Sequence, residues 1–129
     1  MDTIADMLVK IKNASLREHE TVSFPYSKLK HAILECLKKE GYIGRIEKKT
    51  LKGKDVIEVG LVYVEGGASR IHELSRVSKP SKRVYMGVKD LKSVKNGRGI
   101  QVLSTPKGIM ADKEARKELV GGEVILSIW

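Results

Sequence analysis

The segment from Ser104 to Gly108 holds the side chains with the clearest chemistry in this 129-residue chain: two hydroxyls, a proline, a lysine and a glycine, at the end of an apolar stretch. Hydroxyls both donate and accept hydrogen bonds, which suits contact with the sugars and base edges of an irregular nucleic acid. They suit catalysis poorly, because no general base is encoded near them. We therefore expect Ser104, Thr105, Pro106, Lys107 and Gly108 to contact RNA.

Enzymatic alternatives lack their partner residues. Ser104 as the nucleophile of a small hydrolase would need a base and an orienting acid, yet the nearest histidine in the sequence is His72, with no pairing motif. The segment Gly97-Arg98-Gly99 lacks the third glycine of a dinucleotide fingerprint, and a turn explains it better. The sequence thus predicts a protein without catalytic residues.

Metal and cofactor sites are not expected either. Cys36 is the only cysteine, which excludes disulfide pairs and thiolate metal sites. The histidines His19, His31 and His72 lie far apart, without the spacing of metal ligands. The first residues do not resemble a secretory signal, and no apolar run approaches the ~18 residues of a membrane span. We expect a soluble, cytoplasmic protein without metal, cofactor or membrane partner.

Basic residues outnumber acidic ones, and the excess lies in the second half of the chain. There are 25 Lys and Arg against 16 Asp and Glu, which gives a formal net charge of +9. Residues 1–65 contribute a net +2, whereas residues 66–129 contribute +7. A charge confined to one half favours a binding face for an anionic partner over a generally solubilising surface. The candidate phosphate contacts surround one turn: Lys79, Lys82 and Arg83.

An aromatic residue, Tyr85, lies directly after these cations. It can either pack within a sheet or stack on an RNA base. The chain has only one Phe and one Trp, so a broad aromatic platform for single strands is not expected. This composition favours recognition of folded RNA.

Apolar periodicity predicts alternating helices and strands over the first half. Helical spacing predicts one helix that starts near Thr3 and a second that is capped by Ser27 and stopped by Gly41. Leu29 and Cys36 are expected on the apolar face of the second helix. The predicted strands are 21–25, 42–49 and 56–63, the last two joined as a hairpin. The order is therefore αβαββ.

The second half is predicted to be mainly strand. Four strands are expected, together with a helical turn at 88–94, a turn at 96–99 and a helix at 112–119. The strands are 71–77, 83–86, 100–103 and 123–129. The small, flexible segment 66–69 coincides with the change in charge and marks a boundary. We predict an α+β fold of two small domains, an N-terminal αβαββ module over residues 1–65 and a mainly β, basic, RNA-binding module with short helices over residues 66–129.

An ordered series of motifs matches a known family over nearly the whole chain. It includes Ile4-Ala5-Asp6-Met7-Leu8, Pro25-Tyr26-Ser27-Lys28-Leu29-Lys30, Lys39-Glu40-Gly41-Tyr42-Ile43, Arg76-Val77-Ser78-Lys79-Pro80, Leu103-Ser104-Thr105 and Gly121-Gly122-Glu123-Val124. On these residues the chain resembles the bacterial small-subunit ribosomal protein eight family. So many matches in order are far more specific than any single motif.

The resemblance implies a structural constituent of the small ribosomal subunit, without catalysis or cofactor. It implies primary binding to the central domain of small-subunit ribosomal RNA, a role in subunit assembly, and contacts with neighbouring small-subunit ribosomal proteins. The alternative is a free-standing translational regulator that binds its own messenger RNA. By motif position the RNA contacts are Ser104, Thr105, Lys107 and Gly108, with Tyr85 and the turn Gly121-Gly122-Glu123 alongside, and Thr3 and Lys30 from the N-terminal domain.

Three positions depart from the family pattern, namely Pro106, Ala111 and Ser81, the last of which replaces the usual glycine after Lys79-Pro80 while the cations are kept. Pro106 stands where the family commonly has a serine, and it offers neither a hydroxyl nor an amide donor. It also biases Thr105 toward an extended backbone. Losing one neutral hydrogen bond costs about 0.5–1.5 kcal/mol, less than several phosphate contacts together, so we expect altered base recognition with binding retained. Ala111 stands where the family commonly has threonine, so Asp112 is expected to cap the next helix.

Overall fold

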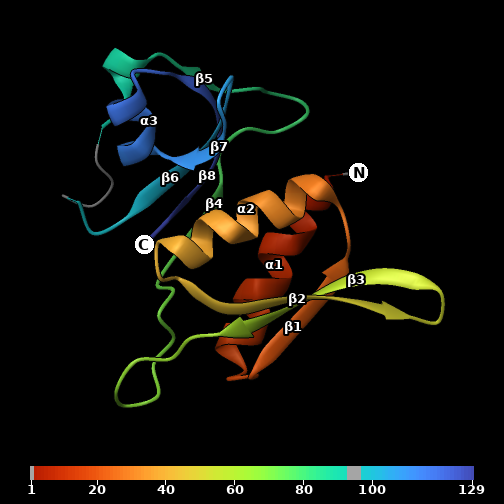
Figure 1. Ribbon diagram of the computed structural model, residues 1–129. Helices are drawn as coiled ribbons and strands as arrows, with labels where there is room; N and C mark the ends of the chain where they lie inside the picture. Colours follow the sequence, from red (N-terminus) through yellow and green to blue (C-terminus); the bar gives the residue numbers. More distant parts are fainter. Residues whose placement is uncertain (1, 93–96) are drawn as a thin grey trace. The chain divides into compact units, whose positions relative to one another are not determined.

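Two compact units make up the computed structural model, which describes residues 2–92 and 97–129 (Figure 1). One unit is Thr3–Ile71, and the other joins Asp2 to His72–Trp129. Among the described residues, no helix is both long and apolar enough to cross a bilayer.

The segment that follows residue 65 folds back onto the first unit. The Arg70 amide donates to the Val62 carbonyl at 3.0 Å, and Tyr63 forms a bridge with Ser69. These hydrogen bonds explain why the compact units divide after Ile71. The predicted domains, which divide after residue 65, remain a prediction.

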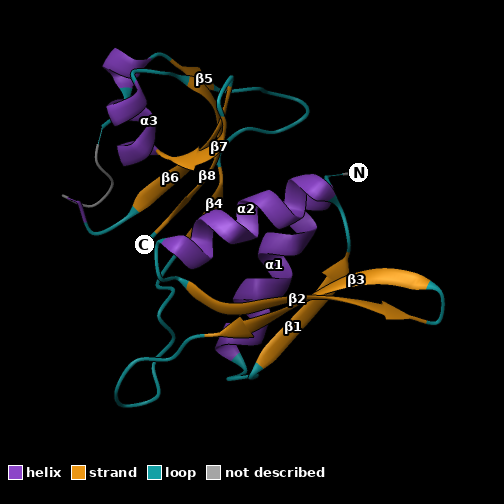
Figure 2. Ribbon diagram, viewed as in Figure 1, coloured by secondary structure: helices purple, strands orange, loops and turns teal. Residues whose placement is uncertain are grey.

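The first unit has the predicted αβαββ order. Its elements are α1 (Thr3–Leu16), β1 (Thr21–Pro25), α2 (Lys28–Lys39), β2 (Ile43–Leu51) and β3 (Lys54–Leu61). The three strands form an antiparallel sheet in the order β1-β3-β2. Both helices cover one face of this sheet, and the far end of the β2–β3 hairpin extends beyond them (Figure 2).

Local signals set the ends of these elements. Ser27 caps α2, because its hydroxyl accepts the Lys30 amide at 3.1 Å. Gly41 follows α2 with a φ of 83°, a conformation that suits glycine. Lys52 and Gly53 both have positive φ, as a two-residue hairpin turn requires. The predicted limits of α2 at Ser27 and Gly41 are confirmed. The predicted hairpin is present, but its turn has only two residues, because β2 and β3 extend closer to the turn than predicted.

The core of the first unit lies between the helices and the sheet. Its largest fully buried side chains are Met7, Ile11, Ile33, Leu34, Leu37, Ile57 and Val59. Cys36 is buried, as predicted, and behaves as a small apolar residue. The placement of Leu29 on the buried face was wrong, because this side chain is 47% exposed. It lies in the first turn of α2, where the next residue, Lys30, is buried in its place.

The second unit is mainly strand, as predicted. Its elements are β4 (Leu74–Arg76), β5 (Tyr85–Met86), the 3-10 turn η1 (Val88–Asp90), β6 (Ile100–Thr105), β7 (Gly108–Ala111), α3 (Asp112–Glu118) and β8 (Gly122–Ile128). The sheet is antiparallel, in the order β4-β8-β6-β7, and β5 also pairs with β8. The chain therefore has the predicted α+β fold.

The predicted strands of this unit need correction, and part of a predicted helical turn lies outside the described residues. Strand β7 was not predicted, and Ser104 and Thr105 belong to strand β6 instead of a loop. A strand of four residues across a two-residue turn carries too little periodicity to be recognised. The helical turn predicted at 88–94 is present over Val88–Asp90, while its last two residues and Asn96 lie outside the described residues.

Helix α3 packs on the core of the second unit, formed by Leu91, Leu103, Met110, Ala115 and Val124. The prediction that Asp112 caps α3 was wrong. Ala111 is the N-cap, without a side-chain hydrogen bond, and Asp112 is the first helical residue. The buried Asp112 carboxylate instead accepts the Gln101 amide at 3.2 Å and pairs with Arg116 at 3.0 Å, so it joins α3 to β6.

Candidate nucleic-acid interface

A tight hairpin presents the Ser104–Gly108 segment. Strands β6 and β7 pair Thr105 directly with Gly108, so only Pro106 and Lys107 remain in the turn. The Thr105 hydroxyl spans this turn, because Oγ1 donates to the Gly108 carbonyl at 2.8 Å and accepts the Lys107 amide at 3.1 Å. We call residues 105–108 the hairpin tip. Its shape depends on the Thr105 side chain.

Proline at the hairpin tip constrains the backbone. Two-residue hairpin turns usually need positive φ in the turn, which Pro106 cannot adopt. Neither Pro106 nor Lys107 has a positive φ, and Gly108 takes a φ of 114° directly after them. Thr105 is extended, as expected for the residue before a proline. Gly108 therefore accommodates the turn that Pro106 imposes.

Three residues on adjacent strands form a row beside the hairpin tip. Ser104 of β6 pairs with Glu123 of β8, and Glu123 pairs with Tyr85 of β5. Directly paired residues in antiparallel strands project to the same side of the sheet. We call Tyr85, Glu123 and Ser104 the Tyr85 row. It unites residues that are up to 38 positions apart in the sequence.

The two ends of the Tyr85 row are open for contact. The Tyr85 side chain is 70% exposed, so it does not pack within the sheet. Ser104 is partly buried, and its hydroxyl makes no hydrogen bond to any other described residue. An open ring and a free hydroxyl can stack on a base and hydrogen-bond to its edge.

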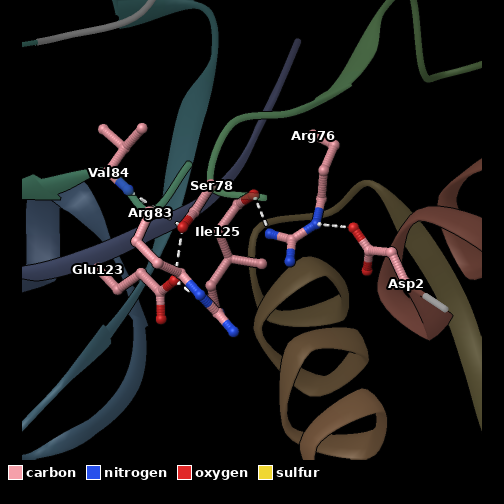
Figure 3. Close-up of polar contacts among 7 residues, drawn as sticks. All are labelled: Asp2, Arg76, Ser78, Arg83, Val84, Glu123 and Ile125. Atoms are coloured by element: carbon pink, nitrogen blue, oxygen red, sulfur yellow. Dashed lines mark hydrogen bonds and ion pairs between the residues drawn. The ribbon is translucent and has the colours of Figure 1, made fainter. Parts of the chain in front are cut away.

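The centre of the Tyr85 row is Glu123, whose carboxylate is held by two neighbouring side chains (Figure 3). The fully buried Ser78 hydroxyl donates to Glu123 Oε2 at 2.5 Å and accepts the Val84 amide at 3.1 Å. Arg83 Nη1 donates to the same carboxylate oxygen at 3.0 Å. The Ser78 hydrogen bond, followed by those of Arg83, lowers the pKa of Glu123 below its ordinary 4.5, although burial opposes the shift.

Arg76 is held within the second unit by two polar contacts (Figure 3). Its Nη1 donates to the Ile125 carbonyl at 2.8 Å, and its Nε pairs with Asp2 at 3.2 Å. Its side chain is only 13% exposed. Arg76 therefore stabilises β4 against β8 and is not a free cation.

Gly121 and Gly122 allow the strands of the Tyr85 row to approach. A Cβ built on Gly122 would collide with the Ser104 carbonyl, and one on Gly121 would collide with the Met86 carbonyl. Their absent side chains thus let β8 lie close to both β6 and β5. This packing role is visible in the structure, whereas RNA contact by these glycines remains a prediction.

The predicted cations are in two different states. Lys79 and Lys82 bracket a turn that is closed by two backbone hydrogen bonds of 3.0 Å, and their ammonium groups have no ion-pair partner in the described part of the chain. Arg83 is bound to Glu123, as described above. Lys107 Nζ lies 3.2 Å from Glu118 Oε2. Two of these four cations, Arg83 and Lys107, are therefore paired with acids.

The remaining predicted contacts, Thr3 and Lys30, belong to the first unit. Thr3 is exposed at the start of α1. Lys30 is 7% exposed, and its Nζ lies 3.4 Å from the Pro25 carbonyl. Neither residue belongs to the unit that contains the Tyr85 row, and RNA contact by Thr3 and Lys30 remains a prediction.

The contacts that Ser78 and Glu118 make were not predicted from the sequence. Ser78 reaches an acid 45 positions away, and Glu118 reaches a lysine 11 positions away, so no local pattern indicates either contact. In residues 2–92 and 97–129, no group of three or more His, Cys, Asp or Glu is placed to hold a metal ion. This surface presents backbone, hydroxyl, aromatic and charged groups, which suit the binding of a nucleic acid.

The fold and this surface define a class, namely small basic α+β proteins that bind nucleic acid. The model of the family described as Ribosomal protein S8 matches residues 2–129. Similar proteins include the small ribosomal subunit protein uS8 of Cereibacter sphaeroides (strain ATCC 17025), 50% identical over 129 residues, which cover 99% of this chain and 97% of the relative. The uS8 of Dictyoglomus thermophilum is 52% identical over 128 residues, with the same coverage of both chains.

The chain belongs to the ribosomal protein S8 family. It is thus a structural, RNA-binding constituent of the small ribosomal subunit in the cytoplasm, and not an enzyme. This confirms the resemblance inferred from the motifs. It also accounts for the absence of a general base near Ser104 in the sequence.

Proposed function

We propose that this chain binds the central domain of small-subunit ribosomal RNA through the Tyr85 row and the hairpin tip. The single observation that carries the proposal is the Tyr85 row, in which an exposed ring, a carboxylate held by Ser78 and Arg83, and a hydroxyl without a partner among the described residues lie side by side. Tyr85 stacks on an unpaired base, and Ser104 hydrogen-bonds to a base edge or a 2′-hydroxyl.

Phosphate contacts supply the remaining affinity. Lys79 and Lys82 are exposed and need no displacement of an acid, so they attract phosphates at any RNA sequence. Lys107 at the hairpin tip adds a contact beside Ser104. The Tyr85 row therefore discriminates between RNA targets, and the lysines provide binding affinity that decreases as the salt concentration rises.

This binding supports assembly of the small subunit, because it fixes an irregular RNA segment on a rigid sheet. The chain's own messenger RNA is a second target only where it presents the same local shape to the Tyr85 row. Thr3 and Lys30 add contacts from the first unit. For Lys30 this requires its ammonium to leave the Pro25 carbonyl.

The test is an NMR titration of the full chain with a central-domain RNA fragment and, separately, with an unrelated RNA duplex. We expect the central-domain fragment to shift the amide signals of Ser104, Gly108 and Tyr85 at stoichiometric RNA. The duplex is expected to shift mainly the signals around Lys79 and Lys82. Central-domain binding that leaves the Tyr85 row unperturbed would overturn the proposal.

A further inference from the structure

Glu118 occupies an unfavourable place in its own helix. It is the last residue of α3, where the partial negative charge of the helix terminus disfavours an acid. Its carboxylate lies 3.2 Å from the ammonium of Lys107, and the two side chains are 48% and 55% exposed. The contact with Lys107 thus compensates for a charge that the helix does not favour.

A phosphate that binds Lys107 has to compete with this carboxylate. Both groups accept from the same ammonium, and two anions close together repel each other. An ion pair between two exposed side chains is weak, so base and sugar contacts that position the hairpin tip can displace it. A duplex that makes no such contacts gains little from breaking the pair.

We propose that Glu118 is a specificity-determining residue, which withholds Lys107 from RNA that does not engage the Tyr85 row. This inference rests on the proposed function. In the complex with its target, Lys107 leaves Glu118 and binds a phosphate. In complexes with unrelated duplexes, the pair of Lys107 and Glu118 stays closed.

The test compares the wild type with Glu118→Gln in salt series of binding to the central-domain fragment and to an unrelated duplex. For the duplex, we expect Glu118→Gln to steepen the slope of log K against log salt by about one, because one more lysine is free. For the central-domain fragment, we expect an unchanged slope and an affinity gain of at most about fivefold. The ratio of the two affinities therefore falls.

Two controls identify the cause. In a Lys107→Ala background, Glu118→Gln is expected to have no effect on the duplex slope. Glu65→Gln removes the same charge from an exposed loop of the other unit and is expected to leave both slopes unchanged. An unchanged duplex slope in Glu118→Gln, or an equal effect of Glu65→Gln, overturns this inference. Failure of the proposed function would instead appear in the wild type alone, as equal affinity for the two RNAs.

Discussion

The hydroxyl of Thr105 donates a hydrogen bond to the carbonyl of Gly108 at 2.8 Å, across a turn of two residues. The same oxygen accepts the Lys107 amide at 3.1 Å, so its one proton is already used within the protein. Ser104, one position earlier, has a hydroxyl without a partner among the described residues. The two adjacent hydroxyls thus have different roles. That of Ser104 is open to RNA, whereas that of Thr105 shapes the hairpin.

Replacing Thr105 by valine is expected to destabilise the fold. The substitution removes two hydrogen bonds while keeping the shape of the side chain, so we expect a loss of about 1–3 kcal/mol in the free energy of unfolding. Urea unfolding measures this loss. Thr105→Ser keeps the hydroxyl and is expected to stay close to the wild type. Equal stability of Thr105→Val and the wild type would show that the hydroxyl does not hold the hairpin tip.

Replacing Ser104 by alanine is expected to change recognition and not stability. Its hydroxyl has no partner to lose within the described protein, so the free energy of unfolding should stay within about 0.5 kcal/mol of the wild type. Loss of one hydrogen bond to RNA should lower the preference for the central-domain fragment over an unrelated duplex by roughly two- to tenfold. Competition binding measures this preference, and an unchanged preference would remove Ser104 from the contact surface.

Gly108→Ala and Gly122→Ala are both expected to destabilise the protein, for different reasons. Gly108 has a φ of 114° with open space at its Cβ, so Gly108→Ala should cost about 1–3 kcal/mol from backbone strain alone. Gly122→Ala places a Cβ against the Ser104 carbonyl and must separate β8 from β6. Amide hydrogen exchange distinguishes the two. Loss of protection along β6 and β8 is expected for Gly122→Ala, whereas loss confined to the hairpin tip is expected for Gly108→Ala.

Glu123 is expected to make stability depend on pH in the acid range. Its pKa in the folded protein is lowered, chiefly by the Ser78 hydroxyl, from an ordinary value of 4.5. A lowered pKa stabilises the fold above 4.5, and this contribution is lost as the pH falls through the lower folded value. Urea midpoints from pH 7 down to 3 measure the effect.

The matched variants for this pH dependence are Glu123→Gln and Ser78→Ala. Glu123→Gln removes the titrating group, so its stability should fall less steeply below pH 4.5 than that of the wild type. Ser78→Ala should raise the pKa of Glu123 toward its ordinary value. An acid limb that is identical in the wild type and Glu123→Gln would contradict the assigned hydrogen bonds.

Local chemistry made part of the fold predictable. Ser27 and Gly41 bound α2 through interactions within a few residues, and the hairpin between β2 and β3 was predicted from its turn residues, although with a longer connection than the two-residue turn observed. Strand β7 and the role of Asp112 were not predictable in this way. Both depend on pairing with β6, which is a matter of tertiary structure.

The candidate site shows the same division. The Ser104–Gly108 segment and Tyr85 were identified from residue type and surrounding charge. Their alignment in one row required strand pairings between β5, β8 and β6, which no local pattern specifies. The ion pairs of Arg83 with Glu123 and of Lys107 with Glu118 were not predicted for this reason, and they alter what these cations can do in the free protein.

The central claim is that the chain binds the central-domain RNA through the Tyr85 row. The most direct test is to measure the dissociation constants of the wild-type chain for an unrelated RNA duplex and for the central-domain fragment at one moderate salt concentration, and to divide the first by the second. Binding through the Tyr85 row predicts a ratio well above one, on the order of 10³ or more as in specific complexes of other nucleic-acid-binding proteins. The ratio should fall in Ser104→Ala. A ratio near one would mean that phosphate attraction alone holds the RNA, and it would contradict the account.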